Sequence, residues 1–192
     1  MLIDILISKV RVKILELFLG NPGASFHVRE IVRRVQEEIN AVRRELARLE
    51  KTGLLTSEWR ANRRFYSVRR DFIFFPEFLA MVNKSVGLGG AILANKAKLG
   101  KIKYAMLSSS FIKGKPYAQN EVDLFVVGTI VLPELGSIIR EEEARRGREI
   151  NFTPMTEEEF AFRKNRRDPF LMGILSKPRV MLIGDEEEMV KL

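Results

Sequence analysis

The chain of 192 residues carries 33 lysines and arginines against 25 aspartates and glutamates, a formal net charge of +8, with 46% hydrophobic residues. It has no cysteine and a single histidine, which excludes disulfides, cysteine nucleophiles and multi-histidine metal centres. No apolar run is long enough to span a bilayer and no signal-peptide pattern is present, so we expect a soluble, cytoplasmic protein with no membrane partner.

Residues 1–70 predict three helices followed by a hairpin. Ser8 suits the N-cap of a first amphipathic helix. A second, short helix is expected over Phe26–Val35, with His27 as a cap or surface residue rather than a metal ligand. A third helix is expected over Asn40–Thr52, and it is the element that points most directly to a function.

The third helix has one apolar face and one basic face. Val42, Leu46 and Leu49 recur at i, i+4 and i+7, which places them on one side of a helix. The other side and its flanks carry polar and basic residues, namely Asn40, Arg43, Arg44, Arg48 and Lys51. Gly53 follows and suits a helix end in the left-handed conformation.

A hairpin with a basic turn comes next, with strands expected over Leu54–Trp59 and Phe65–Val68. The turn contains the arginines Arg60, Arg63 and Arg64. Residues 1–70 hold 15 Lys/Arg against 8 Asp/Glu, whereas residues 71–192 hold 18 against 17, so nearly all the net charge lies in the first part. Arginines on a helix are often only a solvated face, but this local excess favours double-stranded DNA as a partner.

The segment from Val42 to Leu55 resembles the recognition helix of the bacterial and archaeal ArsR/MarR-like regulators, which end this helix with a similar leucine-rich stretch and Gly-Leu. The resemblance implies a winged helix-turn-helix DNA-binding domain, which we assign to residues 1–70. The corner at Val35–Ile39 lacks the usual glycine. The absence of cysteine excludes a thiol-based metal sensor. Regulators of this type usually bind palindromic DNA as homodimers.

Residues 71–90 are expected to form a linker helix. The segment Phe72–Phe78 is rich in phenylalanine, and Pro76 suits the first turn of a helix. One interpretation is that these aromatic residues pack the linker onto the domains. The other is that they form a homodimer interface together with the apolar segment Met1–Ile7.

Residues 91–192 alternate between strand and helix patterns, which predicts an α/β domain with a mixed sheet. The expected strands lie at Lys103–Ser108, Val122–Val127, Glu149–Pro154 and Val180–Ile183. The expected helices lie at Ala91–Leu99, Pro133–Arg146, Thr156–Arg163 and Asp168–Leu175, before an acidic terminal helix. A loop is expected over Ser109–Asn120. The predicted fold class is therefore α+β with two domains.

The stretch from Met106 to Gly128, followed by Arg148–Phe152, resembles the polymerase-beta-like nucleotidyltransferase superfamily. That family reads Gly-Ser, two residues, Arg-Gly, a loop, and then Asp-x-Asp on a strand. The resemblance implies that nucleotide phosphates bind at Ser109, Ser110, Lys113 and Gly114. It also implies Mg²⁺ ligands at Glu121 and Asp123, with Asn151 in the position of the third catalytic aspartate.

The positions that carry the chemistry depart from the family pattern. Ser109 replaces a glycine, Glu121 replaces the first aspartate, and the neutral Asn151 replaces the third. Glu149 is expected on the same strand face as Asn151. The alternative interpretation is that Glu121 and Asp123 are a solvated strand end. We therefore assign no catalytic residue and expect an inactive sensor or dimerisation domain, with Mg²⁺ and a nucleotide as the candidate cofactors.

Three functions remain open from the sequence. The first is a DNA-binding transcriptional regulator with an inactive nucleotidyltransferase-like domain. The second is an active Mg²⁺-dependent nucleotidyltransferase, and the third is an antitoxin-like nucleotidyltransferase module that covers a toxin. The first is favoured because the DNA-contacting features are intact while the catalytic ones are altered.

Overall fold

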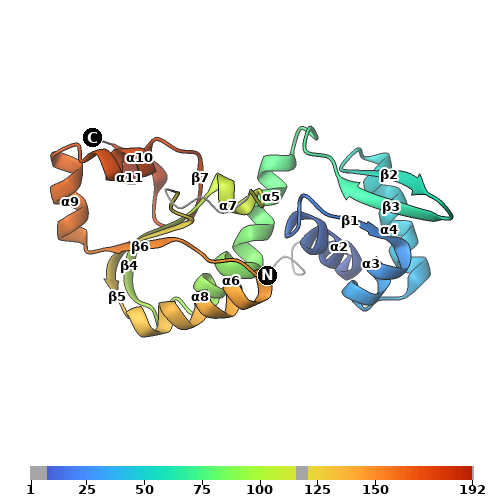
Figure 1. The fold of residues 1–192 in the computed structure, drawn as a ribbon, viewed down its shortest axis with the longest axis horizontal. Helices are drawn as coiled ribbons and strands as arrows, with labels where there is room; N and C mark the ends of the chain where they lie inside the picture. The colour runs from blue at the N-terminus through green and yellow to red at the C-terminus, as the bar shows by residue number, and fades with distance from the viewer. Residues whose placement is uncertain (1–7, 116–120, 192) are drawn as a thin grey trace. The chain divides into compact units, whose positions relative to one another are not determined.

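The computed structural model describes residues 8–115 and 121–191 (Figure 1). Within these ranges the chain mixes α and β structure, with ten helices and two sheets, as the fold class predicted. Contacts divide the chain into two compact units between Val86 and Gly87, and each unit is described by itself. No helix in the described ranges is long and apolar enough to cross a membrane.

From residue 8 onward, the first unit combines four helices with a three-stranded antiparallel sheet. Its helices are α2 (Lys9–Leu19), α3 (Val28–Val35), α4 (Ile39–Lys51) and α5 (Phe75–Ser85). Its strands are β1 (Ser25–His27), β2 (Leu55–Arg60) and β3 (Arg63–Val68). The sheet order is β1-β3-β2, so β3 pairs on both sides, and β2 and β3 form the expected hairpin.

The core of the first unit is built from the apolar sides of its helices. The least exposed of its described side chains are Val12, Ile14, Ile31, Val42, Leu46 and Val82. The ring of Phe18 meets Phe26 edge to face, with 5.5 Å between the ring centroids. Phe26 also pairs with Tyr66 across β1 and β3. The prediction that the second helix begins at Phe26 is therefore wrong: residues 25–27 join the sheet, and the helix begins at Val28.

Local capping fixes the ends of these helices. The Ser8 hydroxyl accepts a hydrogen bond from the Arg11 backbone N–H at 3.2 Å, and His27 Nδ1 accepts one from the Glu30 N–H at 3.3 Å. Both predicted caps are confirmed. Gly53 follows α4 with φ at +83°, the left-handed conformation that its position predicted.

The second unit consists of a four-stranded sheet with helices packed around it. The helices are α6 (Gly87–Ala94), α7 (Ser109–Ile112), α8 (Leu132–Arg146), α9 (Glu157–Asn165), α10 (Pro169–Leu175) and α11 (Glu186–Val190). The strands are β4 (Gly100–Ser108), β5 (Leu124–Ile130), β6 (Phe152–Met155) and β7 (Arg179–Ile183). Their order is β6-β5-β4-β7; β5 and β6 are parallel while the other neighbours are antiparallel. The predicted mixed sheet is confirmed.

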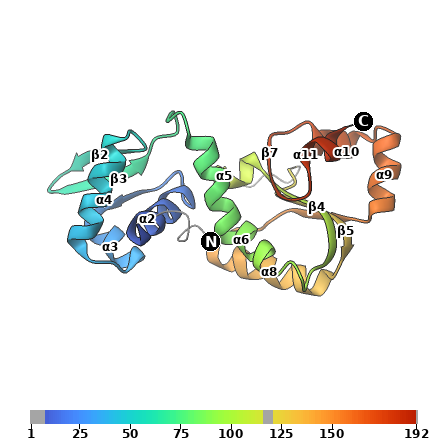
Figure 2. The same cartoon turned by 180° about the vertical axis from the view of Figure 1, so that it is seen from behind.

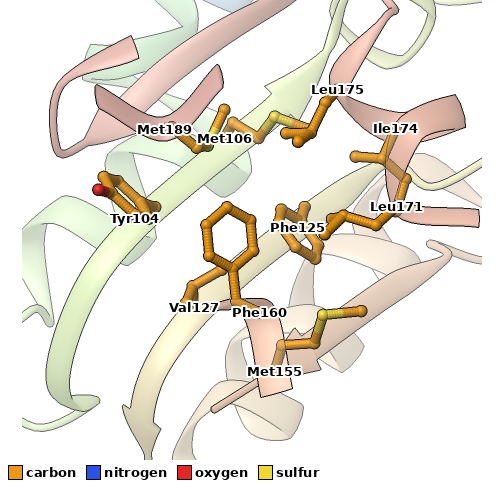
Figure 3. Close-up of a cluster of buried hydrophobic side chains, with 10 residues drawn as sticks. All are labelled: Tyr104, Met106, Phe125, Val127, Met155, Phe160, Leu171, Ile174, Leu175 and Met189. Atoms are coloured by element: carbon orange, nitrogen blue, oxygen red, sulfur yellow. The ribbon is translucent and has the colours of Figure 1, made fainter. Parts of the chain in front are cut away.

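The two faces of this sheet are covered by different helices. Helices α9, α10 and α11 lie over one face, and α6 and α8 lie on the opposite side (Figures 1 and 2). Figure 3 shows the core on the first face, where Phe125 of β5 lies between Phe160 of α9 and Leu171 of α10. Met106 of β4 lies beside Met189 of α11 in the same cluster. This packing fixes the strand β5, and the two acidic residues Glu121 and Asp123 lie just before its first residue, Leu124.

Strand β5 extends further than its sequence pattern predicted. The pattern ends at Gly128, but pairing with β4 continues to Ile130. Gly128 has φ at +147°, and a Cβ atom there would lie 2.2 Å from the carbonyl oxygen of Lys101. Only glycine allows the backbones of β4 and β5 to approach each other this closely. Gly128 therefore lies within the strand and does not end it.

Candidate functional site

Helix α4 presents a polar and basic face to solvent. Val42, Leu46 and Leu49 are buried in the core of the first unit, as predicted. The residues predicted for DNA contact on this helix are all exposed: Asn40, Arg43, Arg44, Arg48 and Lys51. The helix begins at Ile39 because the Glu38 carboxylate accepts hydrogen bonds from the backbone N–H groups of Asn40 and Ala41.

The cations of α4 differ in what they contact. Arg48 lies 3.3 Å from the Glu45 carboxylate, which is buried and also contacts Arg11 at 2.8 Å. In contrast, Arg43, Arg44 and Lys51 have no ion pair within the described part of the chain. These three side chains therefore keep their charge and donors available for a partner.

The three arginines of the hairpin divide in the same way. Arg64 Nη2 contacts both carboxylate oxygens of Glu50, at 3.0 and 2.9 Å, and its guanidinium lies over the ring of Tyr66. Arg60 pairs with Glu58. Arg63 is exposed and has no ion pair among the described residues. Of the three arginines predicted to contact DNA, Arg63 is thus the one with no carboxylate partner in the described part of the unit.

One exposed aromatic residue on the hairpin was missed by the sequence reasoning. Trp59 is 69% exposed and is the single tryptophan of the chain. It pairs with Arg64 across β2 and β3, so both side chains project from the same face of the hairpin. Strand alternation places Trp59 on the same face as the buried Leu55, so the pattern alone predicts a buried side chain and could not have revealed its exposure.

In the second unit, the buried carboxylate of Asp123 binds groups of the chain itself. Arg148 Nη2 lies 3.1 Å from Asp123 Oδ2, and the backbone N–H of Asn151 donates to the same oxygen at 3.2 Å. Burial raises the pKa of Asp123 despite the opposing attraction of Arg148. Arg148 was not among the residues singled out by the family resemblance. Its guanidinium lies beside the Asp123 carboxylate, where a metal ion would lie if Asp123 were a metal ligand.

The neighbouring Glu121 is also engaged. Its carboxylate lies 3.4 Å from Lys177 Nζ, and the Asn151 side chain donates to the Glu121 carbonyl oxygen at 3.0 Å. A hydrogen bond from Ser110 and the attraction of Lys177 lower the pKa of Glu121. The structure therefore brings Glu121, Asp123 and Asn151 together through hydrogen bonds, as the motif order implied.

The acidic residues here do not fit a pair of Mg²⁺ ions. No group of three or more acidic, histidine or cysteine side chains arranged for a metal occurs among residues 8–115 and 121–191. The prediction that Glu149 shares a strand face with Asn151 is wrong, because β6 begins at Phe152 and Glu149 is exposed before it. The positive charges of Arg148 and Lys177 offset those of the two carboxylates, so the local net charge does not favour binding of Mg²⁺ ions.

The predicted phosphate-binding residues line one side of a small pocket. It has a volume of about 250 Å³, and its walls include Ser109, Ser110, Lys113 and Glu121. Gly114 lies next to it with φ at +65°. Five further lining residues were not among those predicted to bind phosphate: Ser108, Lys115, Val122, Lys177 and Pro178.

The residues predicted from sequence thus fall into two groups, the exposed basic surface of the first unit and the serine- and lysine-lined pocket of the second. Comparison with known proteins adds nothing to them: no family model matches the chain, and no curated protein or solved structure shows significant similarity to it.

Proposed function

We propose that this protein binds double-stranded DNA through α4 and the β2–β3 hairpin and acts as a transcriptional regulator. The observation that carries the proposal is a group of four exposed cations on α4 and the hairpin that have no ion pair among the described residues: Arg43, Arg44, Lys51 and Arg63. Basic side chains that are not neutralised by their own chain are available for phosphates and for guanine edges. We call these four residues the basic face.

The order of elements supports this reading. Helices α2, α3 and α4 precede the β2–β3 hairpin, and β3 also pairs with β1; this order supports the proposal of a winged helix-turn-helix. In such a domain the third helix enters the major groove and the hairpin lies against the backbone. Helix α4 has 13 residues, about 20 Å of helix, which is long enough to cross a major groove roughly 12 Å wide.

The second unit is proposed to act as a sensor or dimerisation module rather than as a transferase. Two-metal nucleotidyl transfer depends on carboxylates that hold Mg²⁺ through the charge shift of the reaction. Here the carboxylates of Asp123 and Glu121 face Arg148 and Lys177. The neutral Asn151 replaces a third carboxylate and uses its side-chain amide to bind the Glu121 carbonyl.

Selection from a pool of duplexes with a randomised centre tests the proposal. The wild-type chain is expected to enrich a defined sequence, because side chains on α4 can reach base edges. A variant with alanine at all four positions of the basic face is expected to enrich none. The matched control replaces four exposed cations of the second unit, Lys96, Lys98, Lys101 and Arg140, and is expected to behave as the wild type.

Either of two results would overturn the proposal. The first is a wild-type protein that retains no duplex above the level of the quadruple variant. The second is a control variant that loses enrichment to the same extent, since net charge alone would then explain the binding.

A further inference from the structure

Trp59 is an exposed side chain near the tip of the β2–β3 hairpin. It is 69% exposed and lies on β2, one residue before this strand ends at Arg60. The tip of the hairpin projects from the first unit (Figures 1 and 2). An indole gains free energy when its large apolar surface leaves water, and tryptophan is enriched where proteins contact their partners. The exposure of Trp59 therefore calls for a partner that covers it.

The arginines next to Trp59 cover the other two aromatic rings of the hairpin. The Arg60 guanidinium lies over the Phe65 ring, 4.8 Å from its centroid, and the Arg64 guanidinium lies over the Tyr66 ring at 5.3 Å. In contrast, Trp59 has no ring contact and no cation over its face among residues 8–115 and 121–191. The faces of its indole are thus free to pack against another molecule.

Trp59 projects from the face of the hairpin that contacts α4. Directly opposed residues of an antiparallel pair share a face, and on this face Trp59 pairs with Arg64 while Ser57 pairs with Tyr66. The Ser57 hydroxyl and the Arg64 guanidinium both contact the Glu50 carboxylate of α4. The indole therefore lies on the same side of the hairpin as the helix that is proposed to enter the major groove.

Two residues of the basic face lie close to this side chain. Arg63 immediately precedes Arg64, the strand partner of Trp59. Burial raises the pKa of Tyr66, and the positive charges of Arg64 and Arg43 oppose this rise, so Arg43 of α4 lies near the same face of the hairpin. A polyanion that these cations attract would bring its own uncharged surface against the indole.

We propose that Trp59 contacts the bound duplex directly, with its indole packed against deoxyribose rings, and supplies a part of the affinity that does not depend on salt. The inference rests on the proposed function, because it requires a bound duplex, and it adds an uncharged contact to the basic face. An indole displaces no counterions from DNA, whereas each lysine or arginine that contacts a phosphate does. The two kinds of contact can therefore be told apart by experiment.

The fluorescence of Trp59 tests the contact in the wild-type, full-length protein, because the chain has no other tryptophan. The probe is the duplex that the wild-type chain retains in the selection from randomised sequences. Acrylamide quenching of the indole is measured without DNA and with saturating duplex, and saturation is established by the anisotropy of a labelled duplex. The quenching constant is expected to fall about twofold or more, since DNA excludes water and quencher from a ring that it covers.

Variants separate the uncharged contact from the charged ones. Trp59→Ala is expected to raise the Kd for this duplex roughly tenfold at every salt concentration, with an unchanged slope of log binding constant against log salt. Trp59→Phe, which keeps an aromatic ring, is expected to retain part of the lost affinity. Arg63→Ala is expected to reduce the magnitude of the slope by about 0.9. The control is Phe162→Ala, an exposed aromatic residue of the second unit, which is expected to bind as the wild type.

Three outcomes would overturn the inference while duplex binding itself stands. The first is acrylamide quenching that is the same with and without saturating duplex. The second is wild-type affinity in Trp59→Ala, and the third is a loss of affinity in that variant that appears as a change of slope. A wild-type chain that retains no duplex would instead overturn the proposed function together with this contact. The quenching measurement uses the wild type alone, so its result does not depend on how any variant folds.

Discussion

Glu45 is a buried carboxylate on the same helix as the basic face. It accepts hydrogen bonds from the Ser8 hydroxyl at 3.0 Å and from Arg11 Nε at 2.8 Å, and Arg48 lies 3.3 Å away. Burial alone would raise its pKa, but the hydrogen bonds from Arg11 and Ser8 outweigh burial, and the pKa is lowered below 4.5. The residue therefore ties α4 to the start of α2 in its ionised form.

The lowered pKa of Glu45 predicts how the first unit responds to acid. A carboxylate with a folded-state pKa below its unfolded value stabilises the fold above the unfolded pKa, and this stability is lost as pH falls through the folded value. Glu45→Gln is expected to lower the free energy of unfolding by about 1–3 kcal/mol at pH 7. The difference between variant and wild type is expected to shrink as pH falls below 4.5.

Urea unfolding followed by the fluorescence of Trp59 measures this, because the single tryptophan lies in the first unit. Glu16→Gln is the control, since burial raises the pKa of Glu16 and its contribution to stability is opposite in sign. A Glu45→Gln penalty that is the same at pH 3 and pH 7 would contradict the assigned ion-pair role.

At the scale of elements, the hairpin offers two adjacent arginines with different roles. Arg64 contacts Glu50 of α4 through both carboxylate oxygens, whereas Arg63 has no ion pair among the described residues. Arg64→Ala is expected to destabilise the first unit by about 0.5–1.5 kcal/mol, and Arg63→Ala is expected to leave stability within about 0.5 kcal/mol. Duplex affinity is expected to fall in Arg63→Ala with the fold intact.

Paired measurements of urea unfolding and duplex affinity on these two variants check the division. Their equal charge and neighbouring positions make each the control for the other. The opposite result, with Arg63→Ala destabilised and Arg64→Ala as stable as the wild type, would contradict the stabilising role assigned to Arg64.

Elements with strong local signals were predictable from sequence. The apolar spacing of Val42, Leu46 and Leu49 predicted α4 and its buried side, and Ser8 and Gly53 marked helix ends. Elements that depend on distant partners were not. Phe26 and His27 of β1 were assigned to the following helix, because the strand partner of Phe26, Tyr66 of β3, is far along the chain.

The candidate site shows the same limit. The motif order predicted that Glu121, Asp123 and Asn151 would meet, and hydrogen bonds join them. The sequence did not reveal that Arg148 would face Asp123, since which arginine approaches a buried carboxylate depends on how α8 leads into β6. Similarly, the adjacent arginines of the hairpin differ only by which face of the strand each occupies.

At the scale of the whole molecule, the proposed regulator is expected to be a homodimer. Residues 1–7, one of the two segments predicted for the interface, lie outside the described residues. In the other segment, Ile73 and Phe74 are 78% and 55% exposed, and Phe72 contacts the rings of Phe74 and Phe78. An exposed aromatic cluster of this kind is typical of an interaction surface.

Light scattering at micromolar concentration is expected to give twice the chain mass of 22.1 kDa. Replacing Ile73 and Phe74 by serine is expected to shift the mass towards the monomer, because the apolar contact that stabilises association is removed. Replacing Trp59 by serine, an exposed aromatic of the hairpin, is the control and is expected to leave the dimer unchanged. A monomer mass for the wild type would contradict the predicted assembly.

The salt dependence of duplex affinity measures whether the basic face binds the phosphates of a duplex. The logarithm of the binding constant is expected to fall linearly with the logarithm of salt concentration, with a slope near −0.9 for each phosphate contact. If all four residues contact phosphates, the quadruple alanine variant at Arg43, Arg44, Lys51 and Arg63 is expected to have a slope smaller in magnitude by roughly 3–4. The four-residue control in the second unit should keep the wild-type slope. Equal slopes for the wild type and the basic-face variant would show that these four residues do not contact phosphates.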